Sequence, residues 1–256
     1  MSPRASISRA IAQASASGEP ALIAYLTAGF PQRATFRDAL RALARAAHVI
    51  EVGVPFTDPM ADGVTIQRAS LAALAAGVSL RWILAELEAL GPLGVPLLLM
   101  SYLNPLLAFG LGALAAAAAR AGVAGFIVPD LPLDESGELR AALAARELAL
   151  VQMVTPVTEP ARLAQLCAGS EGFVYAVTMT GTTGRNVAVP EEVLGYLARV
   201  RAAATLPVCA GFGIRSREQV RRLRGHVEGV VVGSALVEVL ERGEDPAAWL
   251  QALRAG

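Results

Sequence analysis

One carboxylate lies where a carboxylate is unusual, inside an apolar run. Glu51 interrupts the run HVIEVGV (48–54), and Asp58 and Asp62 follow in the next loop. Burial disfavours the charged form of a carboxyl group, raises its pKa and suits it to general acid–base catalysis near neutral pH. The spacing therefore indicates a site with two carboxylates, in which Asp62 folds back toward Glu51. The alternative is a strand that ends in solvent and is followed by ordinary turn residues.

Glycines mark a second kind of site in the C-terminal half of the chain. They follow three apolar runs, in the segments TMTGTTGRN (178–186), GFGI (211–214) and GSA (233–235). Glycine lets backbone N–H groups approach an anion closely, and a helix that begins there adds partial positive charge. These segments predict a phosphate-binding site built mainly from backbone amides and helped by Arg185, unless the glycines serve only as turn residues.

The chain contains no lysine: all 22 basic residues among its 256 are arginine. This composition excludes a Schiff-base lysine, a P-loop lysine and covalently held pyridoxal phosphate. The cysteines, Cys167 and Cys209, and the histidines, His48 and His226, have no metal-ligand spacing, so no metal site is predicted. Phosphate must therefore be held, and catalysis performed, without lysine.

Charge and hydropathy exclude other classes of protein. The 22 basic and 22 acidic residues cancel, so no net charge attracts nucleic acid or an anionic membrane. The most apolar stretch (95–129) is broken by Asn104, Pro105 and Arg120. A membrane-spanning helix needs about 20 mostly apolar residues in a row, so none is expected here. Because there are only two cysteines, a reducing, cytoplasmic location is expected.

The elements that must position these residues are eight short apolar runs, which alternate with longer helix-like segments. Because the runs are continuously apolar, they are typical of strands covered on both faces in a parallel sheet. Eight strand–helix units in about 250 residues predict an α/β fold, a single-domain (β/α)8 TIM barrel over residues 1–256. An open doubly wound sheet is the alternative. The runs cover residues 21–27, 48–54, 95–102, 124–130, 148–154, 172–178, 206–212 and 228–233.

Some segments exceed the minimal barrel. We expect an extra N-terminal helix near residues 5–15, two helices after the second strand at 65–76 and 79–90, and a final helix at 245–254. In barrels of this kind the chemistry lies at the C-terminal ends of the strands and in the loops that follow them. That rule places the segment after Glu51 and the glycine segments at the same end of the barrel.

The same rule sorts the remaining polar residues. Asp130 ends the fourth strand at the functional end, where it either takes part in the site or only caps a turn. Tyr175 lies in the sixth strand and either points into the barrel mouth or packs. His48 and His226 fall at the opposite end and are interpreted as structural. The two cysteines are interpreted as small buried apolar residues.

At this point a long motif resembles a known family. The stretch IEVGVPFTDPMADGVTIQ is similar to the signature of the tryptophan synthase alpha subunit family. The resemblance implies a (β/α)8 barrel that cleaves indole-3-glycerol phosphate to indole and glyceraldehyde 3-phosphate in a retro-aldol step. It also implies a beta subunit that carries pyridoxal phosphate and receives the indole in an alpha2beta2 complex, with no cofactor on this chain. The similarity extends through LTAGFP (26–31), SYLNP (101–105), VPDLPLDES (128–136), VYAVTMTGTTGRN (174–186), CAGFGI (209–214) and VVGSA (231–235).

The resemblance also implies roles for individual residues. Glu51 matches the general acid–base that protonates the indole ring at C3, and Asp62 matches the carboxylate that faces the indole N–H. Tyr175 matches a tyrosine near the glycerol chain. The remaining matches are the phosphate contacts Gly184, Gly213, Gly233 and Ser234, the apolar indole slot of Leu22, Ile66 and Met100, the loop-closing pair Asp58 and Thr183, and the beta-subunit contacts Asp58 and Pro59.

Two positions depart from the family pattern: Met179, where many members have arginine, and Leu22, where some members have an aromatic residue. Neither departure removes a proton-transfer group. Three other interpretations stay open at this stage: an isomerase-type barrel that uses two carboxylates, a subunit that only activates a partner, and an alpha chain that produces indole alone. A purely activating subunit has no need of a buried carboxylate, which weighs against the second.

Overall fold

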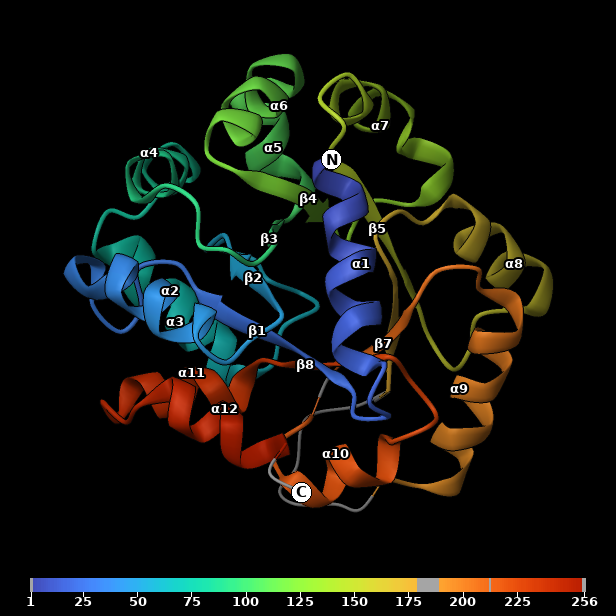
Figure 1. The fold of residues 1–256 in the computed structure, drawn as a ribbon. Helices are drawn as coiled ribbons and strands as arrows, with labels where there is room; N and C mark the ends of the chain where they lie inside the picture. Colours follow the sequence, from blue (N-terminus) through green and yellow to red (C-terminus); the bar gives the residue numbers. More distant parts are fainter. Residues whose placement is uncertain (1, 179–188, 212, 255–256) are drawn as a thin grey trace.

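Eight strands in the described part of the chain form a closed parallel barrel (Figure 1). The computed structural model describes residues 2–178, 189–211 and 213–254. Each strand pairs with its neighbours in chain order, and β8 pairs with β1 at Ala21↔Gly229, which closes the barrel. The barrel prediction is therefore confirmed, and the open sheet is excluded. The strands are β1 (Ala21–Thr27), β2 (Val49–Gly53), β3 (Leu97–Met100), β4 (Val123–Ile127), β5 (Ala149–Val154), β6 (Val174–Val177), β7 (Val208–Gly211) and β8 (Gly229–Val232).

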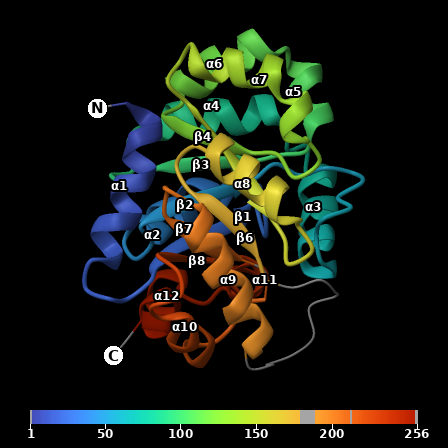
Figure 2. The same ribbon diagram turned by 90° about the vertical axis from the view of Figure 1, so that its right-hand side faces the viewer.

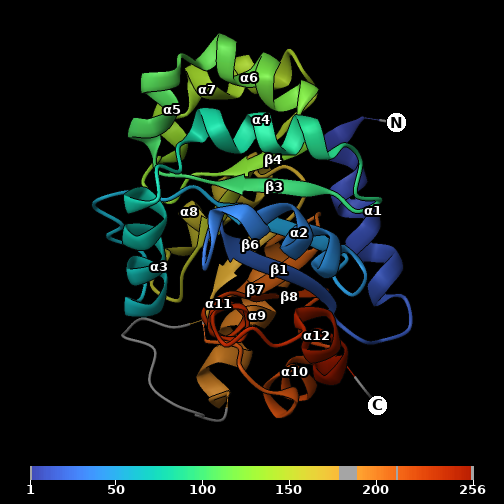
Figure 3. The same cartoon turned by 90° about the vertical axis from the view of Figure 1, so that its left-hand side faces the viewer.

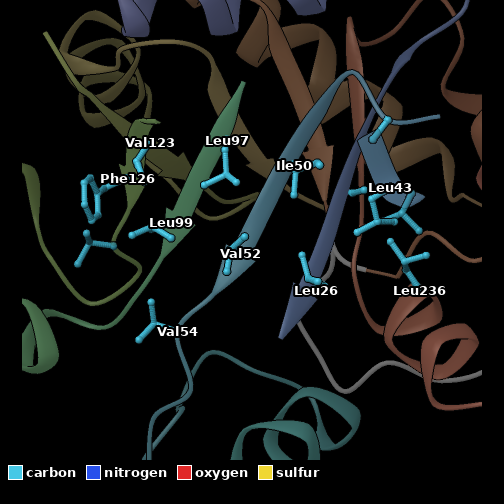
Figure 4. Packing of buried hydrophobic residues seen from close by; sticks show 14 of the residues in the cluster. Leu26, Leu43, Ile50, Val52, Val54, Leu97, Leu99, Val123, Phe126 and Leu236 are labelled. Carbon is cyan, nitrogen blue, oxygen red and sulfur yellow. The ribbon is translucent and has the colours of Figure 1, made fainter. Parts of the chain in front are cut away.

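The strands are apolar on both faces because both faces are covered. In β1, Leu22 and Leu26 pack outward with the helices, whereas Ile23 and Tyr25 face the barrel interior with residues of the other strands. Figure 4 shows part of the outer layer, where Leu26 and other strand side chains pack. Side chains alternate between the two faces of a strand, so each residue's position in the alternation decides which core it joins.

A ring of helices surrounds the barrel, and the extra helices expected from the sequence are present. They lie within two residues of the predicted ranges, at α1, α3, α4 and α12. One pair was not predicted: two helices, α5 and α6, link β3 to β4 and bend by 93° at Gly110, whose positive φ of 87° allows the turn. The helices are α1 (Pro3–Ser15), α2 (Phe36–Ala44), α3 (Val64–Ala75), α4 (Leu80–Leu90), α5 (Leu103–Phe109), α6 (Leu111–Arg120), α7 (Gly137–Ala144), α8 (Pro160–Gly169), α9 (Glu191–Ala203), α10 (Arg217–Leu223), α11 (Ser234–Glu241) and α12 (Pro246–Arg254).

The two ends of the barrel are covered differently. Figures 2 and 3 show α1 at one end of the strands and α3 at the opposite end. Ile7 and Ile11 of α1 are fully buried against the interior cluster, and the Ser8 hydroxyl donates to the Gly172 carbonyl at 2.5 Å. The helix α1 therefore closes the N-terminal end of the barrel. The opposite, C-terminal end of the barrel is not covered by α1 (Figure 2), and the candidate functional site lies there.

The helices are short and belong to this barrel architecture. In the described ranges, no single helix is both long enough and apolar enough to cross a membrane. Two bent helix pairs, α3 with α4 and α5 with α6, meet that test only when each pair is taken together. Their apolar faces pack on the barrel, as Ile83 and Leu114 illustrate.

Candidate active site

A single cavity at the C-terminal end of the barrel brings the two predicted kinds of site together. Glu51 and Asp62 come from the β2 side, and Gly213, Gly233 and Ser234 come from the ends of β7 and β8. Residues more than 150 positions apart in the sequence thus line one cavity, because all strands of a parallel barrel end on the same side. The full lining is Tyr25, Glu51, Asp62, Gly63, Ile66, Met100, Tyr175, Gly213, Val231, Gly233 and Ser234.

Glu51 occupies the middle of β2 and points into the barrel interior, because its neighbours Ile50 and Val52 point outward. It is 1% exposed, and in the described part of the chain neither of its carboxyl oxygens has a hydrogen-bond partner. Burial, and secondarily the nearby charge of Asp62, raises the pKa of Glu51 to about 8. At neutral pH the carboxyl group is therefore mostly protonated and can donate a proton.

Asp62 lies on the loop between β2 and α3, which returns over the barrel mouth. The Tyr102 hydroxyl donates to Asp62 Oδ2 at 3.3 Å, and the Ala61 amide donates to the same hydroxyl at 2.9 Å. Gln67 donates from its side chain to the Asp62 carbonyl at 2.9 Å, which fixes the loop at the start of α3. Burial raises the pKa of Asp62 to about 6, while the hydrogen bond from Tyr102 acts in the opposite direction.

The two carboxyl groups therefore differ in protonation state near pH 7. Glu51, with a pKa of about 8, keeps its proton, whereas Asp62, with a pKa of about 6, is mostly ionised. Environments that push the pKa values of two neighbouring acids apart separate an acid from an anion. This pair can supply a proton at one point of a substrate and stabilise positive charge at another.

Two tyrosines, Tyr25 on β1 and Tyr175 on β6, form part of the wall. Their hydroxyl ends lie against the backbones of Gly53 and Gly211, where a Cβ atom would collide with the phenol rings. Glycine at these two strand positions is thus required by space. Burial raises the pKa of both phenols well above the ordinary value, so they remain neutral hydrogen-bonding groups.

The end of the cavity that is predicted to bind an anion is formed by the loop after β7 and the start of α11. Gly213 has a φ of +87°, a left-handed conformation that favours glycine. Gly233 precedes α11, and its carbonyl accepts from the amides of Leu236 and Val237 at 2.9 and 3.0 Å. The first amides of α11 therefore lie next to the cavity, where the positive end of the helix dipole favours an anion. Of the predicted cradle, Thr183 and Gly184, with Arg185, lie outside the described residues.

The assignment of Leu22 to the indole slot is wrong. Leu22 is fully buried in the outer cluster and lies near the N-terminal end of β1, far from the cavity mouth. The β1 side chain in the cavity is Tyr25, which is three residues further along and on the opposite face. The apolar run that forms β1 carries no polar–apolar alternation that would have distinguished the two positions. Ile66 and Met100 do line the cavity.

Three further residues belong to the site but were not predicted from the sequence: Gly63 and Val231 in the lining, and Tyr102, which bonds to Asp62. Tyr102 could have been predicted, since it comes two residues after β3 at the C-terminal end of the barrel. In the structure its ring stacks on Phe56 with ring centroids 5.2 Å apart. Val231 and Gly63 carried no comparable signal. They enter the lining only because their elements meet at the cavity.

Of the pair predicted to bond when the loop after β6 closes, only Asp58 lies in the described residues. Asp58 is exposed and accepts from the Thr57 hydroxyl at 2.5 Å, whereas Pro59 is buried. Its predicted partner Thr183 and the departure at Met179 both lie outside the described residues.

Several other residues have structural roles. The Asp130 carboxylate accepts from the Leu103 amide at 2.9 Å and so caps α5, which supports the turn-capping alternative. His48 Nδ1 accepts from the Leu22 amide at 3.0 Å at the opposite end of the barrel, as expected for a structural histidine. Cys167 and Cys209 are both buried, as predicted. In the described ranges, no group of three or more His, Cys, Asp or Glu side chains could hold a metal ion.

The fold and this cavity are typical of one class of protein, barrel enzymes that bind a phosphorylated small molecule and transfer protons between carboxyl groups and substrate. A family model described as the tryptophan synthase alpha chain matches residues 11–255. The chain therefore belongs to the tryptophan synthase alpha chain family, as the sequence motifs indicated.

Individual relatives agree with the family model. The chain is 47% identical over 248 residues to the tryptophan synthase alpha chain of Nitratidesulfovibrio vulgaris, covering 96% of each chain. It is 44% identical to that of Carboxydothermus hydrogenoformans, covering 92% of this chain and 89% of the relative.

Solved structures agree as well. A tryptophan synthase structure from M. tuberculosis, in an open form with BRD0059 bound, is 37% identical with a TM-score of 0.88 and 97% coverage of both chains. The alpha subunit from Legionella pneumophila is 28% identical with a TM-score of 0.86 and the same coverage.

Proposed function

We propose that Glu51 and Asp62 carry out the reaction of this family in this chain. The chain is a carbon–carbon lyase that cleaves indole-3-glycerol phosphate to indole and glyceraldehyde 3-phosphate in a retro-aldol step. One observation carries the assignment: a fully buried carboxyl group, with no hydrogen-bond partner in the described ranges, shares a cavity with a second carboxyl group and an amide-rich anion site. An isomerase-type barrel and a purely activating subunit are not needed to explain the site.

Glu51 supplies and recovers the proton. Its protonated carboxyl group transfers a proton to C3 of the indole ring, which leaves the ring cationic. The resulting carboxylate then accepts the proton of the glycerol hydroxyl next to the scissile bond. The carbon–carbon bond breaks as the aldehyde forms, the bonding electrons restore the aromatic indole, and Glu51 is again protonated. A pKa of about 8 suits both directions of this transfer.

Asp62 stabilises the intermediate charge. As an anion it accepts a hydrogen bond from the indole N–H, where positive charge develops after protonation at C3. Tyr102 holds the Asp62 carboxylate through its 3.3 Å hydrogen bond and keeps the pKa lower than burial alone would set it. Tyr175 faces the same cavity and is placed to contact the glycerol chain.

The rest of the substrate is held by apolar contacts and backbone amides. Ile66 and Met100 form the apolar slot for the indole ring. Backbone amides near Gly213, Gly233 and Ser234, together with the α11 dipole, bind the phosphate group. Thr183 and Gly184 complete this cradle in our proposal. No lysine is required, in keeping with the composition of the chain.

The product indole passes to a beta subunit, with which the chain forms an alpha2beta2 complex in the cytoplasm. Pyridoxal phosphate belongs on that partner, because this chain has no lysine to hold it as a Schiff base. Asp58 and Pro59 lie on the loop that contacts the partner. This interface is supported by exposed large apolar side chains near the cavity end, among them Met60, which is 94% exposed on the same loop.

The reaction, substrate and partner are tested by one assay. The purified chain is incubated with indole-3-glycerol phosphate, with and without a tryptophan synthase beta subunit, and indole release is followed. We expect release in both arms and faster release with the partner. No indole in either arm would refute the proposed function.

A further inference from the structure

Glu238 joins three segments that line the cavity, although it does not line the cavity itself. It lies on α11, one helical turn after Ser234. The Thr65 hydroxyl donates to Glu238 Oε1 at 3.2 Å, and the Arg215 guanidinium donates to Glu238 Oε2. Both bonds connect residues far apart in sequence, from α3 and from the loop after β7.

Each partner of Glu238 is a near neighbour of a cavity residue. Thr65 precedes Ile66 in α3, and Arg215 follows Gly213 by two positions. The Arg215 backbone is fixed as well, since its amide donates to Gln219 Oε1 at 2.7 Å at the start of α10. One carboxylate therefore accepts hydrogen bonds from α3 and from the loop after β7 and joins both to α11.

The charges in this cluster bear on an anion. Glu238 places a negative charge one turn inside the helix whose N-terminus faces the cavity, where it would oppose a bound phosphate group. The Arg215 guanidinium cancels that charge. The side chains are only 27% and 29% exposed, so water screens this pair less than it screens an ordinary surface pair. Further along the same helices, Arg68 and Glu241 form a more exposed pair.

We propose that Glu238 is a positioning residue for the phosphate end of the site, and that Arg215 both completes the link and neutralises it. The inference rests on the proposed function, because it assumes that Gly213, Gly233 and Ser234 bind the substrate phosphate. Glu238 touches no substrate. It acts by holding the amides near Gly213 and those at the start of α11 at a fixed distance from each other. Because Glu238 is paired with Arg215, the two side chains together add no net charge.

The test compares double variants that leave the net charge unchanged. Arg215→Ala/Glu238→Ala removes the bond between the loop after β7 and α11, and Arg68→Ala/Glu241→Ala removes the neighbouring pair, which joins α3 to α11. We expect the first double variant to raise KM for indole-3-glycerol phosphate about fivefold, the scale of one partly exposed ion pair, with kcat within about twofold. The second should leave both constants unchanged.

A single variant separates positioning from charge. Arg215→Ala leaves the Glu238 carboxylate near the phosphate without its arginine partner, so KM should rise further than in the Arg215→Ala/Glu238→Ala variant. Removing Glu238 in that background should thus restore part of the affinity, which loss of a merely structural contact would not do. If the single variant binds as well as the double variant, or if the double variant keeps the wild-type KM, the proposal is wrong.

Binding of inorganic phosphate, measured by calorimetry, gives a readout that does not depend on cleavage. If the wild-type protein releases no indole but the Arg215→Ala/Glu238→Ala variant binds phosphate more weakly than the wild type, the proposed reaction is refuted. The positioning role of Glu238 is then still supported. Normal cleavage with unchanged phosphate binding in that variant would refute the link alone. Thr65→Val, which removes one hydrogen bond at nearly constant size, decides by the same readouts should the double variant fail to fold.

Discussion

Two glutamates at the N-terminal end of the barrel and Glu51 in the site at the C-terminal end have opposite environments. At the N-terminal end, Glu171 accepts from the Leu150 amide at 2.9 Å and pairs with Arg4 at 3.1 Å. Glu228 likewise accepts from the Val208 amide at 2.8 Å and pairs with an arginine. At the C-terminal end, Glu51 is more deeply buried than either, yet its carboxyl oxygens have no partner in the described ranges.

The difference separates stability from chemistry. A buried carboxylate that accepts a backbone N–H and faces an arginine is satisfied in its charged form and helps to hold its strand in place. A buried carboxyl group without such partners destabilises the folded protein when it is ionised, but its raised pKa allows it to exchange a proton near neutral pH. The same residue type thus serves the fold at one end and the reaction at the other.

The largest effect is expected from Glu51→Gln, which tests whether the unpartnered carboxyl group performs the chemistry. The amide cannot donate an acidic proton, so kcat should fall by at least 10²–10⁴-fold, the range of a general acid–base group. Indole release from indole-3-glycerol phosphate measures the effect. Near-normal turnover would remove Glu51 from the mechanism.

The same variant should not destabilise the protein. The native pKa of Glu51 is raised from 4.5 to about 8, so between these values the folded state binds its proton more tightly than the unfolded state. The stability contributed by this group is thus fully present below pH 4.5 and is lost as pH rises toward 8. In thermal unfolding, the stability of Glu51→Gln relative to that of the wild-type protein should increase as pH rises from 4.5 to 8.

The pH dependence of the reaction sharpens the contrast further. Cleavage needs protonated Glu51 and ionised Asp62, whose pKa values are about 8 and about 6. A plot of kcat/KM against pH should therefore be bell-shaped, falling about tenfold per pH unit beyond each limb. An activity that keeps rising above pH 9 would contradict the requirement for a protonated Glu51.

A smaller effect is expected from Tyr102→Phe, which removes one hydrogen bond to Asp62 and keeps the ring stacked on Phe56. Loss of one such bond should lower kcat about fivefold. Because the bond lowers the pKa of Asp62, the acid limb of the pH profile should move to higher pH. An unchanged acid limb would show that Tyr102 does not position this carboxylate.

The smallest kinetic effect is expected at the other end of the barrel. Glu171→Ala removes the acceptor of the Leu150 amide and the partner of Arg4. Unfolding should become easier by about 1–3 kcal/mol, the cost of leaving a buried donor unsatisfied, while kcat and KM stay unchanged. Denaturant unfolding and the indole assay together check both halves of this statement. A loss of activity without a loss of stability would reverse the roles of the two ends.

Much of the fold could be predicted because continuous apolar runs, repeated eight times, have few other solutions. The site was predictable in part for the same reason. Once Glu51 and the glycine segments are assigned to strand ends, a parallel barrel has to bring them together. The motif residues Ile66, Met100 and Tyr175 do lie in the cavity lining, while their roles in binding remain predictions.

Local pattern alone could not decide which face of a strand meets the substrate. The run ALIAYLT is buried at every position and apolar up to Thr27, so it has no polar–apolar alternation from which to tell Leu22 from Tyr25. The helix link at Gly110 was hidden in an apolar stretch for a similar reason. Tyr102 and Asp62 are 40 positions apart, and their hydrogen bond depends on β2 and β3 being neighbours.

The class of fold, the family, the place of Glu51 inside an apolar run and a chemistry without lysine follow from the amino-acid sequence alone, because these depend on residue type and order along the chain. Only the tertiary structure decided which side chains share the cavity, how far each carboxyl pKa is raised, and that Glu238 ties three lining segments together. Burial and hydrogen bonding are properties of neighbours in space, and in a closed barrel those neighbours come from distant parts of the chain.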